Sequence, residues 1–145
     1  MDNAKRVALV TGSASGIGSA VAVRLANEGF DTIVNYSRSA DSASNTAERC
    51  NAAGSDTLLV QCDVSSEAGV VSMLDDLEKK YGRLDVVVNN AGTSISTLAK
   101  DFDKVSEEEF DRVLAVNVKG MFLVAKHSIK LFFADFVKVF CKRAD

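Results

Sequence analysis

The sequence contains no proline and no tryptophan among its 145 residues, and it has only three cysteines and one histidine. The absence of proline fits a chain built mainly from regular helices and strands. Cys50, Cys62 and Cys141 are odd in number, widely spaced and without a Cys-x-x-Cys pair, which favours reduced thiols over a disulfide framework or a zinc site. We therefore predict no metal centre. We assign no catalytic role to His127, because a solitary histidine on a helix is usually structural.

Long apolar runs are also missing, since none approaches the length of a membrane span. The N-terminal segment MDNAKRVALVTG is interrupted too early to be a secretory signal. Positive charge is scarce: the formal net charge is −3, and the basic residues before residue 126 are scattered. These absences argue against nucleic acid and membranes as partners. We expect a cytoplasmic globular domain, long enough for one buried core and 47% hydrophobic.

What is present is an alternation of short apolar runs with longer segments of helical period. The runs are rich in Val, Ile and Leu, which is typical of parallel strands buried on both faces. Strand, helix and strand joined by short connections predict right-handed crossovers. The fold class is therefore α/β, a Rossmann-type doubly wound parallel sheet of about four strands in order 3-2-1-4. The expected strands are 6–11, 32–36, 57–62 and 84–89, and the expected helices are 17–27, 41–53 and 67–81.

The last third of the sequence predicts one long helix. Ser106 and Glu109 have the spacing of a capping box at its start, and no stop signal precedes Asp145. The segment IKLFFADFVKVF, residues 129–140, has phenylalanines on one helical face and lysines on the other. We prefer a helix packed on the sheet and followed by unrelated sequence. The alternative is an amphipathic helix that lies on a membrane or a partner.

A glycine-rich loop, TGSASGIG at residues 11–18, lies between the first expected strand and helix, where a doubly wound sheet has its phosphate site. Gly12 permits the turn out of the strand, Gly16 lets a pyrophosphate approach the backbone, and Gly18 lets the helix pack closely on the sheet. The helix N-terminus offers free N–H groups to the anion. For such a loop taken alone, a tight turn without any ligand remains the alternative.

Further motifs follow the loop: CDV at residues 62–64, NNAG at 89–92, and Asn117 within VNVKG. Together with TGSASGIG they resemble the classical short-chain dehydrogenase/reductase family over residues 5 to about 128. The segments VNYS at residues 34–37 and VNVKG at 116–120 are most similar to the 3-oxoacyl-acyl-carrier-protein reductase-like branch of this family. The resemblance implies a dinucleotide-binding Rossmann half-domain at residues 1–130 and a divergent helical tail at 131–145.

The resemblance also implies a role for each motif. Asp63 would hold the adenine amino group, NNAG would line the cofactor ribose, and Asn117 would kink its helix and hold a water of the proton relay. Structural alternatives are a loop aspartate that caps the next helix and a merely structural mid-helix asparagine. The implied cofactor contacts are Gly12, Ser13, Ser15, Gly16, Ile17, Gly18, Asp63, Val64, Asn90, Ala91 and Gly92, and Asn117 is the one implied catalytic residue.

The end of the second expected strand bears on the choice between NADP and NAD. NAD is favoured by a carboxylate there, but the position is Tyr36, while Asp31 precedes the strand and should lie at the opposite edge of the sheet. Ser37 and Arg38 offer a hydroxyl and a guanidinium suited to a 2′-phosphate. Against this, many NADP-specific relatives have a basic residue where this chain has Ser15. We predict NADP, with NAD possible, and contacts from Tyr36, Ser37 and Arg38, although Arg38 could be only a solvated loop charge.

The catalytic groups of the family are the largest absence. The resemblance implies a serine, and a tyrosine followed four residues later by lysine, for reduction of a carbonyl. Tyr36 is followed at that distance by Ala40 and Tyr81 by Asp85, and the last serine, Ser128, still lies in the long helix. No Tyr-x-x-x-Lys occurs.

We therefore predict an NADP-dependent oxidoreductase by family, for a small carbonyl or alcohol substrate, without turnover by this chain itself. The alternatives are a non-catalytic NADP-binding module or interaction subunit, and a fragment with no function of its own. The open edge of strand 84–89 and the Phe-rich tail predict self-association.

Overall fold

The computed structural model of the chain describes residues 5–96 and 99–132. Its strands form one parallel sheet in the order β3-β2-β1-β4, which confirms the predicted fold class and strand order. Val7 of β1 pairs with Asp31 of β2, and Ala8 pairs with Val86 of β4. The strands are β1 (Val7–Val10), β2 (Asp31–Tyr36), β3 (Thr57–Gln61) and β4 (Val86–Val88).

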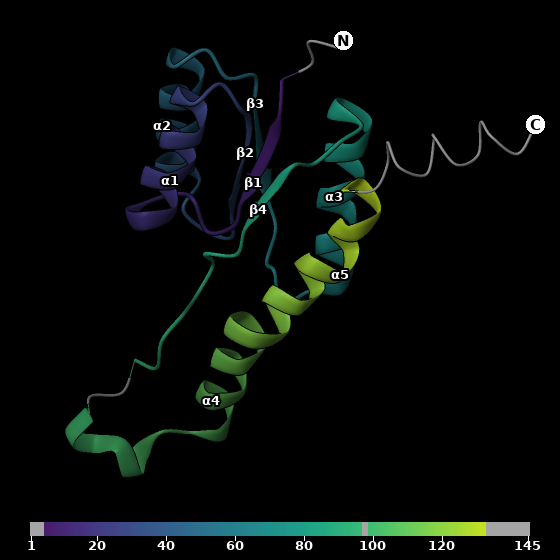
Figure 1. Ribbon diagram of the computed structural model, residues 1–145. Coiled ribbons are helices and arrows are strands. Elements are labelled where there is room, and N and C mark those ends of the chain that lie inside the picture. Colours follow the sequence, from purple (N-terminus) through teal and green to yellow (C-terminus); the bar gives the residue numbers. More distant parts are fainter. Residues whose placement is uncertain (1–4, 97–98, 133–145) are drawn as a thin grey trace, which may run out of the picture.

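Helices cover both faces of this sheet (Figure 1). α1 (Gly16–Asn27) and α2 (Ala40–Ala52) pack on one face, where small side chains such as Ala22, Ala26 and Ala43 meet Val10 and Val34. α3 (Glu67–Tyr81) and α5 (Met121–Phe132) cover the other face with larger side chains. Their core includes Val7, Leu9, Ile33, Val70, Met73, Leu74, Leu77, Leu123, Val124 and Leu131.

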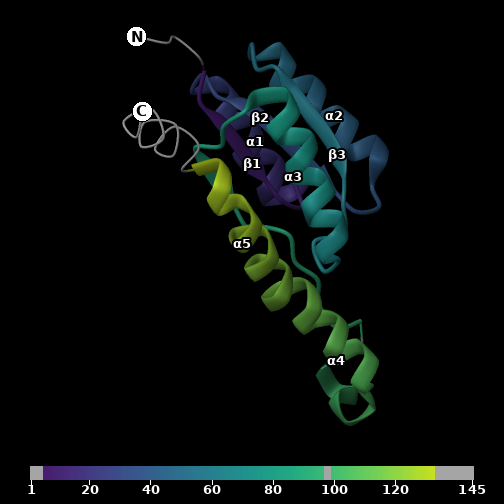
Figure 2. The same cartoon turned by 90° about the vertical axis from the view of Figure 1, so that its right-hand side faces the viewer.

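The predicted long helix is present as far as Phe132, but it is not regular throughout. η1 (Ala99–Lys104) is a short 3-10 segment, followed by α4 (Glu107–Leu114), a π-helical turn η2 (Ala115–Gly120) and then α5. Ser106 begins α4 as predicted, since its Oγ accepts the Glu109 N–H at 3.2 Å. Figure 2 shows α4 and α5 as one rod that extends beyond the sheet. Of the tail predicted at 131–145, residues 133–145, including Cys141, lie outside the described residues.

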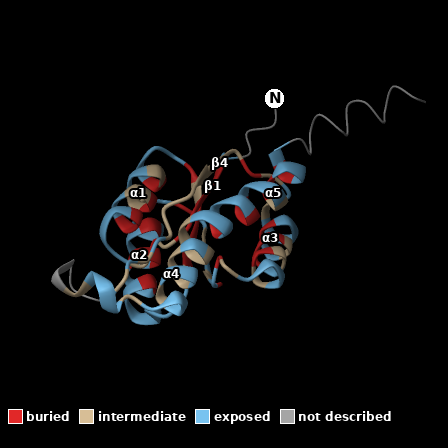
Figure 3. Cartoon of the chain, turned by 90° about the horizontal axis from the view of Figure 1, so that it is seen from below, coloured by how far each residue is buried: buried red, intermediate tan, exposed pale blue. Residues whose placement is uncertain are grey.

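The two outer strands correct the prediction that every strand is buried on both faces. All of β1 is buried, whereas Leu59 of β3 is 38% exposed and β4 is only half-buried. Burial is concentrated in the centre of the sheet, between the helix layers (Figure 3). Within the described residues β3 and β4 each pair with a strand on one side only. Their apolar sequences therefore do not indicate complete burial.

Ion pairs join α5 to α3 at the exposed edge of the apolar interface between the two helices. Glu67 Oε1 lies 2.8 Å from Lys126 Nζ and 2.7 Å from His127 Nε2, and Lys130 Nζ lies 2.8 Å from Glu78 Oε2. Hydrogen bonds from Lys126 and His127 lower the pKa of Glu67 to about 2. His127, which sequence alone left without a partner, is thus a residue of the α3–α5 seam. No helix in the described part of the chain has both the length and the apolarity to cross a membrane.

Candidate cofactor site

The glycine loop turns sharply where β1 ends, and two of its glycines are required by close packing. Gly12 has φ +62°, and a Cβ there would lie 2.7 Å from the Ala91 Cα. A Cβ on Gly18 would lie within 3.0 Å of the Gly12 carbonyl oxygen, the Ser13 Cα and the Asn90 amide. These contacts confirm the predicted turn at Gly12 and the close approach of α1 to the sheet at Gly18.

The N-terminus of α1 keeps its backbone donors available. Ser15 has extended backbone geometry at the N-cap, but its side chain makes no capping hydrogen bond. The first hydrogen bond of the helix runs from the Ser19 N–H to the Ser15 carbonyl, at 3.2 Å. The N–H groups of residues 16–18 come before this bond and have no acceptor within the helix. A Cβ on Gly16 would meet no atom within 4 Å, and Ile17 beside it is 77% exposed. The loop therefore has the free donors and the open backbone that an anion needs.

The NNAG segment is tied to the glycine loop by two polar side chains. The Thr11 hydroxyl accepts the N–H groups of Asn90 and Ala91, each at 3.0 Å. The Asn90 side-chain amide donates to the carbonyls of Thr11 and Gly12, also at 3.0 Å. These bonds hold the end of β4 against the end of β1. The Asn90 amide thus bonds to the backbone of the glycine loop. Its contact with a cofactor remains a prediction.

Asp63 lies at the end of β3 in a tight turn. Its Oδ1 accepts both the N–H of Ser65, at 2.9 Å, and the Ser65 hydroxyl, at 2.7 Å. These bonds, first of all that from the hydroxyl, lower the pKa of Asp63, so the side chain is a carboxylate at neutral pH. Because Ser66 supplies the N-cap of α3, Asp63 does not have the capping role considered as its structural alternative.

Asn117 lies inside the π-helical turn, and both ends of its side-chain amide bond to the backbone of one residue. Its Oδ1 accepts the Thr93 N–H at 2.8 Å, and its Nδ2 donates to the Thr93 carbonyl at 2.8 Å. The helix irregularity expected at Asn117 is therefore present, as a π-turn. Arg112 donates to the Thr93 hydroxyl and, at 2.8 Å, to the Ser94 carbonyl. The loop after NNAG is thus held from one side of the α4–η2 helix.

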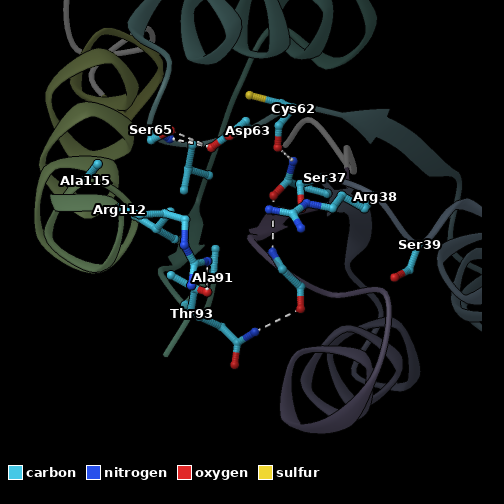
Figure 4. A pocket seen from close by; sticks show the side chains of 16 residues that line it. Ser37, Arg38, Ser39, Cys62, Asp63, Ser65, Ala91, Thr93, Arg112 and Ala115 are labelled. Carbon is cyan, nitrogen blue, oxygen red and sulfur yellow. Dashed lines mark hydrogen bonds between the residues drawn. The ribbon is translucent and has the colours of Figure 1, made fainter. Parts of the chain in front are cut away.

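A cavity of about 460 Å³ opens at the carboxyl ends of the four strands, beside α4. Figure 4 shows Arg38 and Arg112 reaching it from opposite sides, with Asp63 on a third. Eight of the predicted cofactor contacts line this cavity. They are Gly12, Ser37, Arg38, Asp63, Val64, Asn90, Ala91 and Gly92.

The remaining predicted contacts lie elsewhere. Ser15 and Gly16 line a second depression, between α1 and α2, together with Arg49. Ser13 is completely buried, and its hydroxyl donates to the Val10 carbonyl at 2.8 Å. Tyr36 packs partly buried against the α1–α2 core. Asp31 is the first residue of β2 instead of preceding it, yet it lies at the amino end of the sheet, as expected, near Lys5.

The residues of this region that were not predicted as site residues include Asn35, Thr11, Thr93 and Arg112. Asn35 could have been noticed, since an amide inside the apolar run TIVNY is a poor choice for a buried strand unless it has partners. No such signal in the sequence pointed to Arg112 and Thr93. Their hydrogen bond forms between residues 19 positions apart, which only the folded structure brings together.

The cavity lining is suited to binding more than to proton transfer. Neither tyrosine lines it, and the Tyr81 hydroxyl donates instead to the Asp56 carbonyl at 2.9 Å. Burial, with the nearby charge of Asp63, raises the pKa of the Cys62 thiol to about 11, so this thiol is not a nucleophile at neutral pH. The cavity itself offers two guanidinium groups and a carboxylate, whereas the start of α1, with its free N–H groups, borders the second depression.

A cavity at the carboxyl ends of parallel strands, lined by the first glycine of a glycine-rich strand-to-helix loop, is typical of dinucleotide-binding proteins. Comparison with known proteins makes the class specific. The sequence model of the family described as short chain dehydrogenase matches residues 6–136. The chain therefore belongs to the short-chain dehydrogenase/reductase family, as its motifs predicted.

Curated relatives include elsinochrome reductase 1 of Elsinoe fawcettii, 43% identical over 86% of this chain and 46% of the relative. Versicolorin reductase 1 of Aspergillus parasiticus is 38% identical over 86% of this chain and 47% of its own length. A solved short-chain dehydrogenase/reductase of Serratia marcescens, a mutant, superposes with a TM-score of 0.81 at 31% identity, over 89% of this chain and 51% of that one. The chain thus spans about half the length of the curated relatives it matches.

Proposed function

We propose that the chain binds NADP(H) in the cavity at the carboxyl ends of its strands, as the nucleotide-binding part of a short-chain oxidoreductase. The observation that carries this proposal is the convergence of four separate chain segments on one cavity. The turns after β1, β2, β3 and β4 each contribute predicted contacts to it, represented by Gly12, Arg38, Asp63 and Ala91. If the glycine-rich turn only connected β1 to α1, the other three turns would not need to supply residues to the same cavity.

The residues present fit a dinucleotide. The uncapped N-terminus of α1 suits a pyrophosphate, and the open space at Gly16 leaves its backbone accessible. The ionised Asp63 carboxylate suits the amino group of an adenine. Ser37 and Arg38 would hold a 2′-phosphate, because both line the cavity at the end of β2 and no carboxylate follows that strand directly. This last point is our reason for preferring NADP to NAD.

In the family the bound nicotinamide supplies or accepts a hydride at a carbonyl or alcohol carbon. The names of both curated relatives describe reductases, which supports carbonyl reduction as the reaction class for the family member to which this sequence corresponds. Within this chain, Asn117 holds Thr93 beside the cavity, while no Tyr-x-x-x-Lys occurs in the sequence and no phenol lines the cavity. We therefore propose binding without turnover for these 145 residues.

Titration of NADPH fluorescence with the purified chain tests the binding proposal, with NADH as the matched ligand that lacks the 2′-phosphate. We expect saturable binding, tighter for NADPH, and weakening of NADPH towards the NADH value in Arg38→Met. Absence of binding up to millimolar NADPH would refute the proposal. Steady oxidation of NADPH in the presence of simple ketones would refute the proposed lack of turnover.

A second role, association with another chain, is favoured by surfaces that remain uncovered in the described part of the structure. β4 pairs only with β1 there, so one edge of the strand presents backbone groups for pairing. α4, η2 and α5 also present an apolar stripe, defined as Phe110, Leu114, Val118 and Phe122, of which Val118 and Phe122 are each 61% exposed. We propose self-association through the β4 edge. Sedimentation velocity over a range of concentrations tests it, and a monomer at all concentrations would refute it.

A further inference from the structure

Asn35 is a polar residue at the centre of an apolar sheet. It is 1% exposed and lies near the carboxyl end of β2, which is flanked on both sides by other strands. A buried amide that lacks partners is costly, so its presence here points to specific hydrogen bonds. Asn35 also borders the proposed cofactor cavity, although it was not among the predicted cofactor contacts.

Each end of the Asn35 amide meets a different neighbouring segment. Its Oδ1 accepts the N–H of Gly12 at 3.1 Å. Its Nδ2 donates to the carbonyl of Cys62 at 3.1 Å and, at a longer 3.4 Å, to that of Val60. Only this orientation of the amide is compatible with its surroundings, because the opposite one would bring NH₂ against N–H and carbonyl against carbonyl.

The backbone of Asn35 strengthens the same connection. The Ser13 N–H donates to the Asn35 carbonyl at 2.8 Å, and the Asn35 N–H donates to the Ser13 hydroxyl at 3.1 Å. Asn35 therefore accepts hydrogen bonds from the backbone N–H groups of both Gly12 and Ser13. Donors for an anion must then come from the first turn of α1, and the position of that turn depends on where Asn35 holds Gly12.

The two segments that Asn35 joins are the two that border opposite ends of the proposed adenosine site. Gly12 lies in the glycine loop, and Cys62 directly precedes Asp63. Direct pairing between their strands is absent, since β2 lies between β1 and β3 in the sheet. The Asn35 side chain thus links the loop to the end of β3 across the strand that separates them.

We propose that Asn35 is a positioning residue of the dinucleotide site, which sets the distance between the glycine loop and the Asp63 turn. This inference rests on the proposed NADP(H) site. An amide is needed because the position requires one acceptor and one donor in the same plane. Leucine supplies neither, and a carboxylate supplies acceptors only, which would oppose the carbonyls of Cys62 and Val60.

The binding experiment compares Asn35→Leu with Thr32→Val by NADPH titration. Thr32 is a matched control: it is completely buried in the same strand, and its hydroxyl lies 3.0 Å from the Ser55 hydroxyl, but at the opposite end of the sheet. We expect about tenfold weaker NADPH binding in Asn35→Leu and unchanged binding in Thr32→Val. An affinity of Asn35→Leu within twofold of the parent, or an equal loss in both variants, would overturn the proposal.

A pH profile separates positioning from a general loss of packing. In Asn35→Asp the introduced carboxyl is buried, so its pKa is raised and it becomes neutral as the pH falls. The neutral acid has an O–H to donate towards Cys62, and the charged form has none. We therefore expect the ratio of variant to parent dissociation constants for NADPH to fall between pH 8 and pH 5. A constant ratio would contradict the proposal.

Hydrogen exchange without cofactor keeps the test independent of NADPH. We expect the amides of residues 11–18 and 62–64 to exchange faster in Asn35→Leu, or in Asn35→Asp at pH 8 if the leucine variant does not fold, and those of α3 to be unchanged. If the parent chain fails to bind NADPH, the dinucleotide proposal fails and the exchange result still decides the positioning role. Unchanged exchange in the glycine loop would refute that role.

Discussion

The carboxyl end of the sheet and the α4–α5 rod are held in place by different kinds of interaction. At the sheet, buried or half-buried amides and hydroxyls join one backbone segment to another, as Thr11, Asn35 and Asn90 do. Along the rod, exposed ion pairs such as Glu67 with Lys126 lie at the rim, and apolar side chains of α4 face outwards. Neutral hydrogen bonds in a buried setting fix geometry, whereas exposed ion pairs are screened and contribute little.

The difference has a consequence for what each region can do. Among the four turns that border the cavity, those after β1, β3 and β4 are connected through the side chains of Thr11, Asn35 and Asn90, so we expect a displacement at one of them to be transmitted to the others. In the described part of the chain, the rod is joined to the rest of the fold by apolar packing of α5 on α3 and the sheet, and by contacts of Glu109, Arg112 and Asn117 with residues 93–96. Substitutions at the cavity should therefore affect ligand binding strongly, and substitutions along the rod should affect it weakly.

The largest effect is expected for Gly18→Ala. The added Cβ would overlap the Gly12 carbonyl oxygen and the Ser13 Cα, which are backbone atoms and cannot rotate away. We expect a loss of about 3 kcal/mol in the free energy of unfolding, measured by urea denaturation, together with loss of NADPH binding.

Gly29→Ala is the control for this change. Gly29 has φ +85° and open space around its Cβ position, at the far end of α1. The substitution should cost about 1–2 kcal/mol of backbone strain and leave NADPH affinity intact. Equal effects of the two variants on binding would show that the glycine loop is not the sensitive element.

Thr11→Val should have the next largest effect. Valine preserves the shape of the side chain but removes the acceptor for the N–H groups of Asn90 and Ala91. We expect about 2 kcal/mol less stability and weaker NADPH binding, because the NNAG segment is released from the end of β1. Thr57→Val, at the amino end of β3, is the control and should leave binding unchanged. A Thr11→Val chain with parental stability would contradict the proposed tie.

Local sequence patterns were sufficient to locate the strands and the glycine loop, and the strand order followed from the doubly wound fold class that these patterns indicate. The half-burial of β3 and β4 was not predicted, since an apolar strand looks the same at an edge as in the centre of a sheet. The π-turn was anticipated only as an irregularity at Asn117. Its form depends on the Thr93 backbone, which the sequence does not place.

The side-chain links of the candidate site were the least predictable part. Asn35 bonds to residues 23 and 27 positions away, and His127 bonds to Glu67 across 60 positions. Such pairs arise from tertiary packing and leave no mark in a periodic pattern. The motif residues themselves could be predicted, but the residues that hold them could not.

A smaller effect is expected for Arg112→Leu, which tests whether α4 positions the loop after NNAG. The change removes hydrogen bonds to the Thr93 hydroxyl and the Ser94 carbonyl but keeps an apolar side chain of helical propensity. We expect a loss of about 1 kcal/mol and faster amide exchange at residues 93–96. Arg24→Leu, which removes an exposed pair with Glu28, should change neither. Parental exchange at residues 93–96 would show that Asn117 and Glu109 hold the loop without Arg112.

The smallest effect is expected for Glu67→Gln, and it should depend on pH. Because the pKa of Glu67 in the folded chain is lowered to about 2, from an ordinary value of 4.5, its charge stabilises the fold above pH 4.5. That contribution is lost as the pH falls towards 2. The melting temperature of Glu67→Gln should therefore lie slightly below that of the parent at pH 6, and the difference should disappear near pH 2. Glu107→Gln is the control, since Glu107 also begins a helix but forms no ion pair within the described residues. Equal shifts in both variants would attribute the effect to the helix dipole instead of the α3–α5 seam.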